Sequence, residues 1–253
     1  MQIEGQAAIV SGGASGLGRA TAEALAAAWV RVTILDVNET AAAAVAQEVG
    51  GCAFACDVTE AAAVEAAVAA ARERHGPARI AVNCAGIGTP GRIVGREGPL
   101  QLDAFRRVIE VNLIGSFNLL RVAAAEMTTL APLTDGERGI IVSTASVAAY
   151  EGQIGQAAYS ASKGGIVSLT LPAARELARY GVRVVAIAPG IFETPMLRGL
   201  PQDVQESLAM SVPFPSRLGR PTEYAALVLH LCRNTMINGE VIRLDGALRM
   251  APR

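Results

Sequence analysis

The chain is short of lysine, histidine, aromatic residues and net charge. Of its 253 residues, 22 are lysine or arginine, yet Lys163 is the only lysine, two residues are histidine and 4% are aromatic. A formal net charge of −1 gives no electrostatic reason to expect a nucleic acid or an anionic membrane surface as a partner. No apolar run reaches about 18 residues without a charge, so no membrane-spanning helix is expected.

Cysteine is scarce as well, and its spacing does not indicate a metal site. The four cysteines are Cys52, Cys56, Cys84 and Cys232. The first two are not spaced as the CxxC pair of a zinc site, and all four lie in apolar surroundings. Buried small side chains are the better interpretation than metal ligands, so no metal is expected.

What the chain has in abundance is apolar sequence. It is 51% hydrophobic and 18% charged, with a mean hydropathy of +0.36. This composition and length favour a single α/β domain over residues 1–253. The first residues lead directly into "QAAIVSGG", which reads as a strand and a turn and leaves no room for a signal peptide. We therefore expect a cytoplasmic protein.

Short β-branched runs alternate with long alanine-rich stretches along the whole chain. Near-continuous apolar strands that are each followed by a helix predict a parallel sheet covered on both faces, a doubly wound Rossmann-type fold. The predicted strands are 7–10, 30–35, 52–55, 79–83, 139–144, 182–188 and 239–244, and the predicted helices are 16–28, 39–49, 60–75, 103–130, 156–180 and 221–232. The irregular stretches 86–101 and 190–220 follow strands, so they are expected at the carboxyl edge of the sheet, where ligands bind in such folds.

A glycine-rich turn joins the first predicted strand to the first helix. The segment "SGGASGLG" (11–18) has the spacing GxxxGxG. Glycines permit a tight turn and close approach of the backbone, and the helix N-terminus can face a pyrophosphate. Such turns also serve packing alone. The expected cofactor contacts in this turn are Gly12, Ser15, Gly16, Leu17 and Gly18.

An acidic residue closes the second predicted strand. Asp36 lies 18 residues after Gly18, about where a carboxylate accepts hydrogen bonds from an adenosine ribose. A carboxylate there repels a 2′-phosphate, and the neighbouring Val37, Asn38 and Ser15 supply no cation to bind one. The sequence therefore favours NAD over NADP. Alternatively, Asp36 or Asn38 could serve as the N-cap of the next helix, which does not exclude the cofactor role of Asp36.

Further candidate contacts follow the next strands and complete a possible cofactor cleft. Taken singly, each is better explained as an N-cap or a turn, but their positions at successive strand ends favour a cleft that holds the adenine and the sugar beyond it. These residues are Asp57 and Val58 after the third strand, and Asn83, Cys84, Ala85 and Gly86 after the fourth.

The single lysine lies four residues after Tyr159, in "YSASK". Residues so spaced share one helical face, so both side chains can point into one cleft. A cation about 4 Å from a phenol is worth about 4 kcal/mol at an effective dielectric of about 20, enough to lower a pKa of about 10 to near 7. Lysine supplies a compact charge on a flexible stem, which the planar guanidinium of arginine does not. A surface cation beside an amphipathic tyrosine is the alternative.

Ser146, just after the fifth predicted strand, can converge with Tyr159 on one substrate oxygen. Ser143, Ser160 and Ser162 are competing serines. Together with Tyr159 and Lys163, Ser146 completes a set of residues by which the chain resembles the short-chain dehydrogenase/reductase family. The resemblance extends from residue 3 to about residue 247. The motifs that carry the resemblance are the glycine turn, Asp57, "NCAG" (83–86), "VNL" (111–113), Ser146, Tyr159, Lys163 and "PG" (189–190).

This resemblance implies a seven-stranded Rossmann sheet, an NAD-dependent conversion between a secondary alcohol and a ketone, and a homotetramer. It implies that Asn112 distorts its helix and anchors a water in a proton relay to Lys163. It also implies nicotinamide contacts in the segment that contains Pro189, Gly190, Phe192 and Thr194. A non-catalytic NAD-binding module is the alternative from another class, but such a module would be expected to have lost Ser146, Tyr159 or Lys163.

Three longer segments, 144–177, 212–225 and 238–250, are similar to the type 2 3-hydroxyacyl-CoA dehydrogenases within that family. This similarity implies a short-chain 3-hydroxyacyl-CoA as substrate, with Gln153 facing it; a general secondary-alcohol dehydrogenase is the alternative. The segment 87–102 departs from the group because it lacks a lysine-bearing insertion, for which Arg92 and Arg96 could substitute.

Two further features of the sequence concern packing: Trp29 and the small residues on two long helices. Trp29 stands where the family usually has a small residue, and a packing role is expected for it. Small residues on two long helices could permit close packing between subunits of a tetramer or only within one subunit. They are Ala123, Ala124 and Ala125 on the first helix and Ala157, Ala158 and Ala161 on the second.

Overall fold

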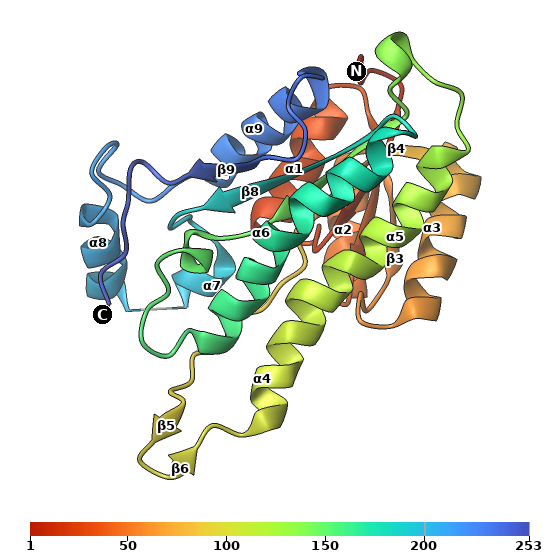
Figure 1. Ribbon diagram of the computed structural model, residues 1–253. Helices are drawn as coiled ribbons and strands as arrows, with labels where there is room; N and C mark the ends of the chain where they lie inside the picture. Colours follow the sequence, from red (N-terminus) through yellow and green to blue (C-terminus); the bar gives the residue numbers. More distant parts are fainter. Residues whose placement is uncertain (200, 253) are drawn as a thin grey trace.

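Seven parallel strands form one sheet in the order β3-β2-β1-β4-β7-β8-β9 (Figure 1). The structure is a computed structural model that describes residues 1–199 and 201–252. The strands of the sheet are β1 (Ala7–Ser11), β2 (Arg31–Asp36), β3 (Cys52–Ala55), β4 (Ala78–Asn83), β7 (Gly139–Thr144), β8 (Val182–Pro189) and β9 (Val241–Leu244). The α/β fold and the seven predicted strands are confirmed.

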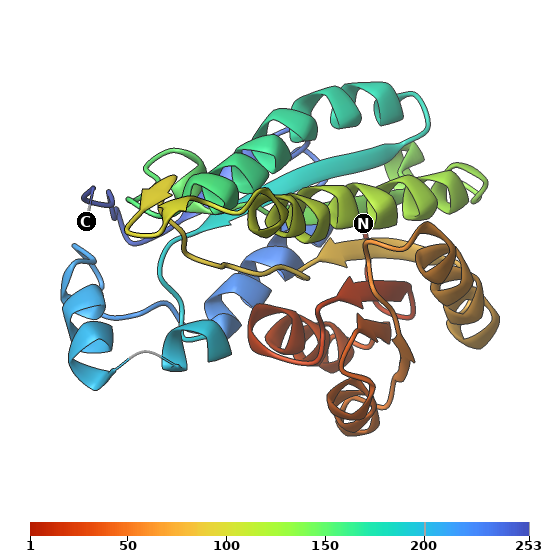
Figure 2. The same cartoon turned by 90° about the horizontal axis from the view of Figure 1, so that it is seen from below.

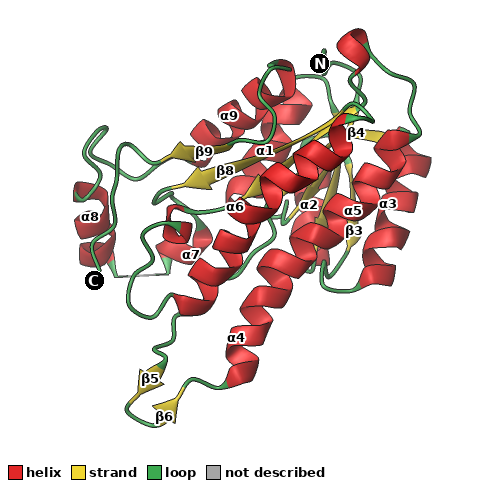
Figure 3. Cartoon of the chain, viewed as in Figure 1, coloured by secondary structure: helices red, strands yellow, loops and turns green. Residues whose placement is uncertain are grey.

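Helices cover both faces of the sheet, as Figures 2 and 3 show. Helices α1, α2 and α9 pack with each other and the sheet in one apolar core, and α3, α5 and α6 pack on the other side. The helices are α1 (Gly16–Ala27), α2 (Glu39–Glu48), α3 (Ala61–His75), α4 (Leu102–Ile109), α5 (Gly115–Thr128), α6 (Ala157–Ala178), α7 (Pro195–Arg198), α8 (Gln202–Met210) and α9 (Pro221–Arg233). This covering explains why every residue of β8 is buried and why the strand sequences are mostly apolar.

The predicted helix 103–130 is interrupted by a π-helical turn. Glu110–Ile114, between α4 and α5, follows i→i+5 geometry and contains Asn112. This confirms the distortion that the family resemblance implied for the helix at that residue. Such turns occur often at functional sites.

The combined segment Leu102–Thr128 is long and apolar enough, by length and composition alone, to cross a membrane. Its best window has a mean hydropathy of 1.4, and 56% of that window is buried inside the protein. Because α5 packs against β4, β7 and α3, much of this apolar surface is already covered by the fold.

The two stretches predicted to be irregular contain short elements. Segment 86–101 forms an exposed hairpin of β5 (Val94–Gly95) and β6 (Gly98–Pro99), which extends away from the sheet (Figure 1). Segment 190–220 contains α7 and α8. Both lie beyond the carboxyl ends of the central strands, where the sequence placed them.

Candidate active site

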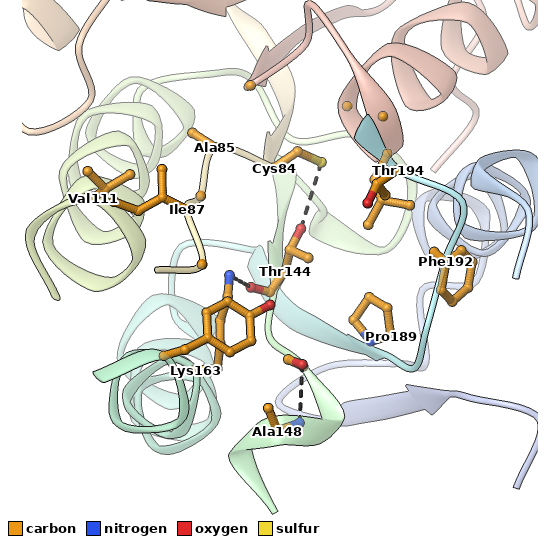
Figure 4. Close-up of a pocket in the computed structure, with 18 of the residues that line it drawn as sticks. Cys84, Ala85, Ile87, Val111, Thr144, Ala148, Lys163, Pro189, Phe192 and Thr194 are labelled. Carbon is orange, nitrogen blue, oxygen red and sulfur yellow. Dashed lines mark hydrogen bonds between the residues drawn. The ribbon is translucent and has the colours of Figure 1, made fainter. Parts of the chain in front are cut away.

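A cavity of about 820 Å³ opens at the carboxyl edge of the sheet (Figure 4). Its walls come from the ends of β1, β2, β4, β7 and β8, from α6 and from the segments that follow these strands. Most of the predicted site residues line it: Gly12, Ser15, Gly16, Leu17, Gly18, Asp36, Asp57, Val58, Cys84, Ala85, Gly86, Ser146, Gln153, Tyr159, Lys163, Pro189, Gly190, Phe192 and Thr194. Segments far apart in the sequence therefore meet around one space, and two predicted residues, Asn83 and Asn112, lie behind its wall.

The glycine turn leaves room that no other residue would leave. Gly12 has a φ of +65°, and a Cβ placed on it would lie 2.6 Å from the backbone nitrogen of Ala85. A Cβ on Gly18 would overlap the carbonyl oxygen of Gly12. At the N-cap of α1, the Ser15 side chain makes no capping hydrogen bond in the described part of the chain. The first N–H groups of α1 are thus available to an anionic group in the cavity.

Asp36 is oriented by two backbone hydrogen bonds. Its Oδ2 accepts from Ala14 N at 3.1 Å, and its Oδ1 accepts from Asn38 N at 3.0 Å. The N-cap of α2 is Asn38, whose side chain accepts from Ala41 N, so the alternative N-cap role for Asp36 is wrong. Asp36 instead links the glycine turn to the end of β2 and borders the cavity.

Asp57 is held at the end of β3 by Thr59, whose backbone N–H and hydroxyl both donate to Oδ1. These bonds, with Arg107 at 3.7 Å from Oδ2, lower the pKa of this carboxyl. Arg107 also lines the cavity, and the sequence analysis missed it. It lies on an amphipathic helix among other exposed charges, so no spacing distinguished it.

Asn83 does not reach the cavity, which corrects its predicted role as a cofactor contact. Its side chain is 2% exposed, and Nδ2 donates to Ser143 Oγ on the neighbouring strand at 3.2 Å. Successive side chains of a strand point to opposite faces of the sheet. The Asn83 side chain is therefore directed into the layer between sheet and helices, while Cys84 and Ala85 beyond it border the cavity.

Lys163 is buried at 4% exposure, and its Nζ donates to the Thr144 carbonyl at 2.8 Å. Figure 4 shows this bond at the floor of the cavity. Burial lowers the pKa of the lysine from 10.5 to about 8, because an ammonium loses its hydration there. Nζ lies 5.8 Å from the centroid of the Tyr159 ring.

The predicted acidification of Tyr159 by Lys163 is wrong for the protein chain by itself. Burial raises the pKa of the phenol, and a hydrogen bond from Ser146 opposes this only in part. Burial of the phenol is the largest influence, because it removes water from the phenolate. The spacing of Tyr159 and Lys163 along the helix can be read from the sequence, but the burial of the Tyr159 phenol cannot.

Ser146 is the serine that faces Tyr159. It is 8% exposed, and its Oγ accepts from Ala148 N at 3.1 Å at the start of a short 3-10 turn. Ser143 instead bonds Asn83, and Ser162 donates to the Tyr159 carbonyl at 2.7 Å. Ser143 and Ser162 thus support the framework of the site, and Ser160 Oγ is buried without a hydrogen-bond partner among the described residues.

Asn112 lies behind the cavity wall and connects two segments by hydrogen bonds. Its Oδ1 accepts from Ile87 N at 2.8 Å, and its Nδ2 donates to Ile87 O at 2.9 Å and to Ser162 Oγ at 3.0 Å. These bonds tie the π-helical turn to the segment after β4 and to α6. The water relay that the family resemblance implies for Asn112 stays a prediction.

Gln153 lines the cavity, but its side chain is already engaged. Its Nε2 donates to the Ala251 carbonyl at 3.1 Å, and Ile154 N donates to Pro252 O at 3.0 Å. Met250, in the same C-terminal segment, also lines the cavity. No local sequence pattern indicates this wall, because the residues that form it lie nearly 100 positions apart.

A family model described as short chain dehydrogenase matches residues 6–205. The chain belongs to this family. It is 52% identical to the bovine 3-hydroxyacyl-CoA dehydrogenase type-2 and 51% identical to the human one, each over 99% of this chain and 97% of the relative. The crystal structure of 3-hydroxyacyl-CoA dehydrogenase type-2 from Mycobacterium avium superposes with a TM-score of 0.95 at 44% identity, covering 100% of this chain and 99% of that one.

The family membership confirms the resemblance expected from the sequence and makes this short-chain dehydrogenase an oxidoreductase. It also gives a reason for the arrangement at the sheet edge. Ser146, Tyr159 and Lys163 come together at one wall of the cavity that the glycine turn bounds on another side.

Proposed function

We propose that this short-chain dehydrogenase uses NAD to interconvert a short-chain 3-hydroxyacyl-CoA and the corresponding 3-oxoacyl-CoA. The observation that carries the proposal is the convergence of Ser146, Tyr159 and Lys163 in a cavity bounded by the glycine turn. The near full-length similarity to 3-hydroxyacyl-CoA dehydrogenases type-2 supports the substrate class.

The residues at the sheet edge fit a dinucleotide. Gly12 and Gly18 form a cradle that a Cβ would fill, and the first turn of α1 offers N–H groups to a pyrophosphate. Asp36 can accept hydrogen bonds from an adenosine ribose. When bound, the nicotinamide accepts or donates the hydride.

The chain's own residues would manage the proton. The Tyr159 hydroxyl donates a proton to the carbonyl oxygen in reduction and becomes a phenolate, and in oxidation the phenolate accepts the proton from the alcohol. Ser146 donates a hydrogen bond to the same oxygen. Lys163, charged below a pKa of about 8, places a positive charge beside Tyr159 that opposes, without overcoming, the rise of the phenol pKa on burial.

Cofactor preference tests the role of Asp36. Asp36→Ala combined with Val37→Arg removes repulsion of a 2′-phosphate and adds a cation for it. The ratio of kcat/KM with NADH to that with NADPH should fall at least tenfold. A wild-type enzyme that prefers NADPH would contradict the assignment.

The substrate assignment is tested with acetoacetyl-CoA and NADH, followed by loss of NADH fluorescence. Arg92, just before β5, and Arg96, between β5 and β6, are exposed and do not line the cavity itself. Arg92→Ala with Arg96→Ala should raise KM for acetoacetyl-CoA and leave ethyl acetoacetate unaffected, because remote contacts of equal strength in both states act on KM.

The second candidate is a general secondary-alcohol dehydrogenase. It is favoured by the absence of lysine from 87–102 and by the exposure of both arginines there. If acetoacetyl-CoA is inert while simple ketones turn over well, this second function replaces the first.

A further inference from the structure

Thr144, the last residue of β7, is the centre of a hydrogen-bonded cluster under the cavity. Its Oγ1 donates to Asn83 O at 2.5 Å and lies 2.7 Å from the hydroxyl of Tyr224. The Cys84 thiol lies 3.8 Å from that hydroxyl and 3.7 Å from Thr144 Oγ1. We call Asn83 O, Cys84, Thr144 and Tyr224 the Thr144 cluster.

The direction of the hydrogen bonds follows from counting protons. The Thr144 hydroxyl has one hydrogen, and the nearby Asn83 carbonyl can only accept it. The Tyr224 hydroxyl must then donate to Thr144 Oγ1, and its own oxygen can accept from the Cys84 thiol. Burial raises the pKa of Tyr224 well above 10 and raises that of Cys84, so both stay protonated and keep these roles at neutral pH.

Two helices on opposite faces of the sheet meet at Thr144. Tyr224, on α9, is 0% exposed and approaches from the face that α1 and α9 cover. Lys163, on α6, approaches from the other face and donates from Nζ to the Thr144 carbonyl (Figure 4). The backbone of Thr144 is therefore held through its side chain by α9 while its carbonyl holds the lysine.

We propose that Tyr224 is a positioning residue for the reaction, which fixes the Thr144 carbonyl and through it the Lys163 ammonium. This inference rests on the proposed role of Lys163 beside Tyr159. Without the Tyr224 hydroxyl, the buried Oγ1 of Thr144 loses its donor. The Thr144 side chain is then held only by its bond to Asn83 O, so its position is less restrained and the bond from Lys163 to its carbonyl weakens.

The titratable groups that face Lys163 determine the expected direction of the effect. They are Tyr159 on its own helix, Cys84 after β4 and, behind Cys84, Tyr224 on α9. All are neutral when protonated, so the Thr144 carbonyl is an acceptor that favours the charged lysine. A weaker bond to it lowers the pKa of Lys163 further below its usual value.

The single lysine of the chain allows a direct test that does not need turnover. In protein labelled with ¹³Cε-lysine, the Lys163 signal is titrated by NMR in the wild type and in Tyr224→Phe. The pKa should fall by roughly half a unit or more, as expected for one weakened hydrogen bond. Thr170→Val is the matched control, because it removes a buried hydroxyl from α6 that bonds only Ile166 O among the described residues; its Lys163 signal should not move.

Kinetics supplies the second readout. Tyr224→Phe should lower kcat about fivefold with less than a twofold change in KM, and the alkaline limb of the pH profile should move to lower pH. Thr144→Val should do the same, and Thr144→Ser, which keeps the hydroxyl, should retain most of the rate. Because one cluster is affected, Tyr224→Phe and Thr144→Val together should be little worse than either alone.

The outcomes that overturn the inference are distinct from those that overturn the proposed function. If Tyr224→Phe lowers Tm but leaves both the Lys163 titration and the pH profile unchanged, Tyr224 is merely structural. If Tyr224→Phe does not fold, Thr144→Val decides in the same way. A wild type that is inert toward acetoacetyl-CoA contradicts the proposed substrate, and the lysine titration still decides the role of Tyr224.

Discussion

At the scale of single residues, Lys163 lowers the stability of the fold, although the proposed reaction requires it. Its pKa, lowered from 10.5 to about 8, corresponds to about 3 kcal/mol of unfavourable free energy for the buried ammonium at neutral pH. The folded chain releases this proton near pH 8 and the unfolded chain near pH 10.5. The unfolded chain therefore binds more protons between these values, and this contribution to stability rises with pH across the window.

We therefore expect Lys163→Met to raise the free energy of unfolding by about 2 kcal/mol at pH 7 while abolishing turnover. The gain is the removed charge, less about 1 kcal/mol for the lost hydrogen bond to Thr144 O. Urea unfolding should show the gain shrinking toward zero at about pH 9.5. A gain that does not depend on pH would contradict burial of the charge as its cause.

Trp29 corrects the packing role expected from the sequence. It is 79% exposed and has a φ of +61°, in the left-handed region that favours glycine. The backbone geometry, a tight turn between α1 and β2, is one that glycine adopts without steric cost. The indole contributes little packing to offset this strain.

Trp29→Gly should accordingly be more stable than Trp29→Ala by about 1 kcal/mol, since only glycine relieves the backbone strain. The comparison by thermal unfolding separates the backbone effect from loss of the indole, which both variants share. Equal stability of the two variants would mean that the strain is absorbed elsewhere. Neither change should alter kcat, because the residue is remote from the cavity.

At the scale of elements, one arginine joins the C-terminal segment to the loop after Ser146. Arg243 of β9 forms two bonds of 2.8 Å to the carboxylate of Glu151 and one of 2.7 Å to Asp245. Its Nη2 also donates to Leu248 O. These contacts hold the loop and the segment that contains Met250 as one wall of the cavity.

Arg243→Lys keeps the charge but loses the forked geometry that two-point pairing requires. KM for the substrate should rise several-fold with little change in kcat, since the wall positions substrate and not the reacting groups. Amide exchange at Ile154, bonded to Pro252 O, should quicken. Arg249→Lys is the control, because Arg249 is 61% exposed and its ion pairs should contribute little; a similar KM increase there would contradict the argument.

At the scale of the whole molecule, the surface of α5 and α6 bears on assembly. Ala123, Ala124 and Ala158 are buried within the subunit, so these three alanines do not serve an interface. The exposed apolar side chains of the same layer are larger: Ile114, Phe117 and Leu171, each 43% to 49% exposed. The homotetramer that the family resemblance implies stays a prediction, and these side chains offer it an apolar surface.

Light scattering at micromolar concentration should give about four times the subunit mass of 26.1 kDa. Phe117→Glu would place a charge in the proposed contact and should reduce the mass to that of a dimer or monomer. Val37→Glu, an exposed apolar change at the other end of the sheet, should leave the mass unaltered. A monomeric wild type would exclude the tetramer.

The sequence by itself determined the succession of strands and helices along the chain, the glycine turn and the position of Asp36. It also determined the set of Ser146, Tyr159 and Lys163. These depend on local periodicity, on turn chemistry and on spacing within one helix, all of which are written in neighbouring residues. The tertiary structure alone decided the direction of Asn83, the burial that raises the pKa of Tyr159, and the meeting of Tyr224 with Thr144. Each of these depends on which distant segments cover a group and exclude water from it. Asn83 and Ser143 are 60 positions apart and Thr144 and Tyr224 are 80 apart, so no local pattern in the sequence indicates these contacts.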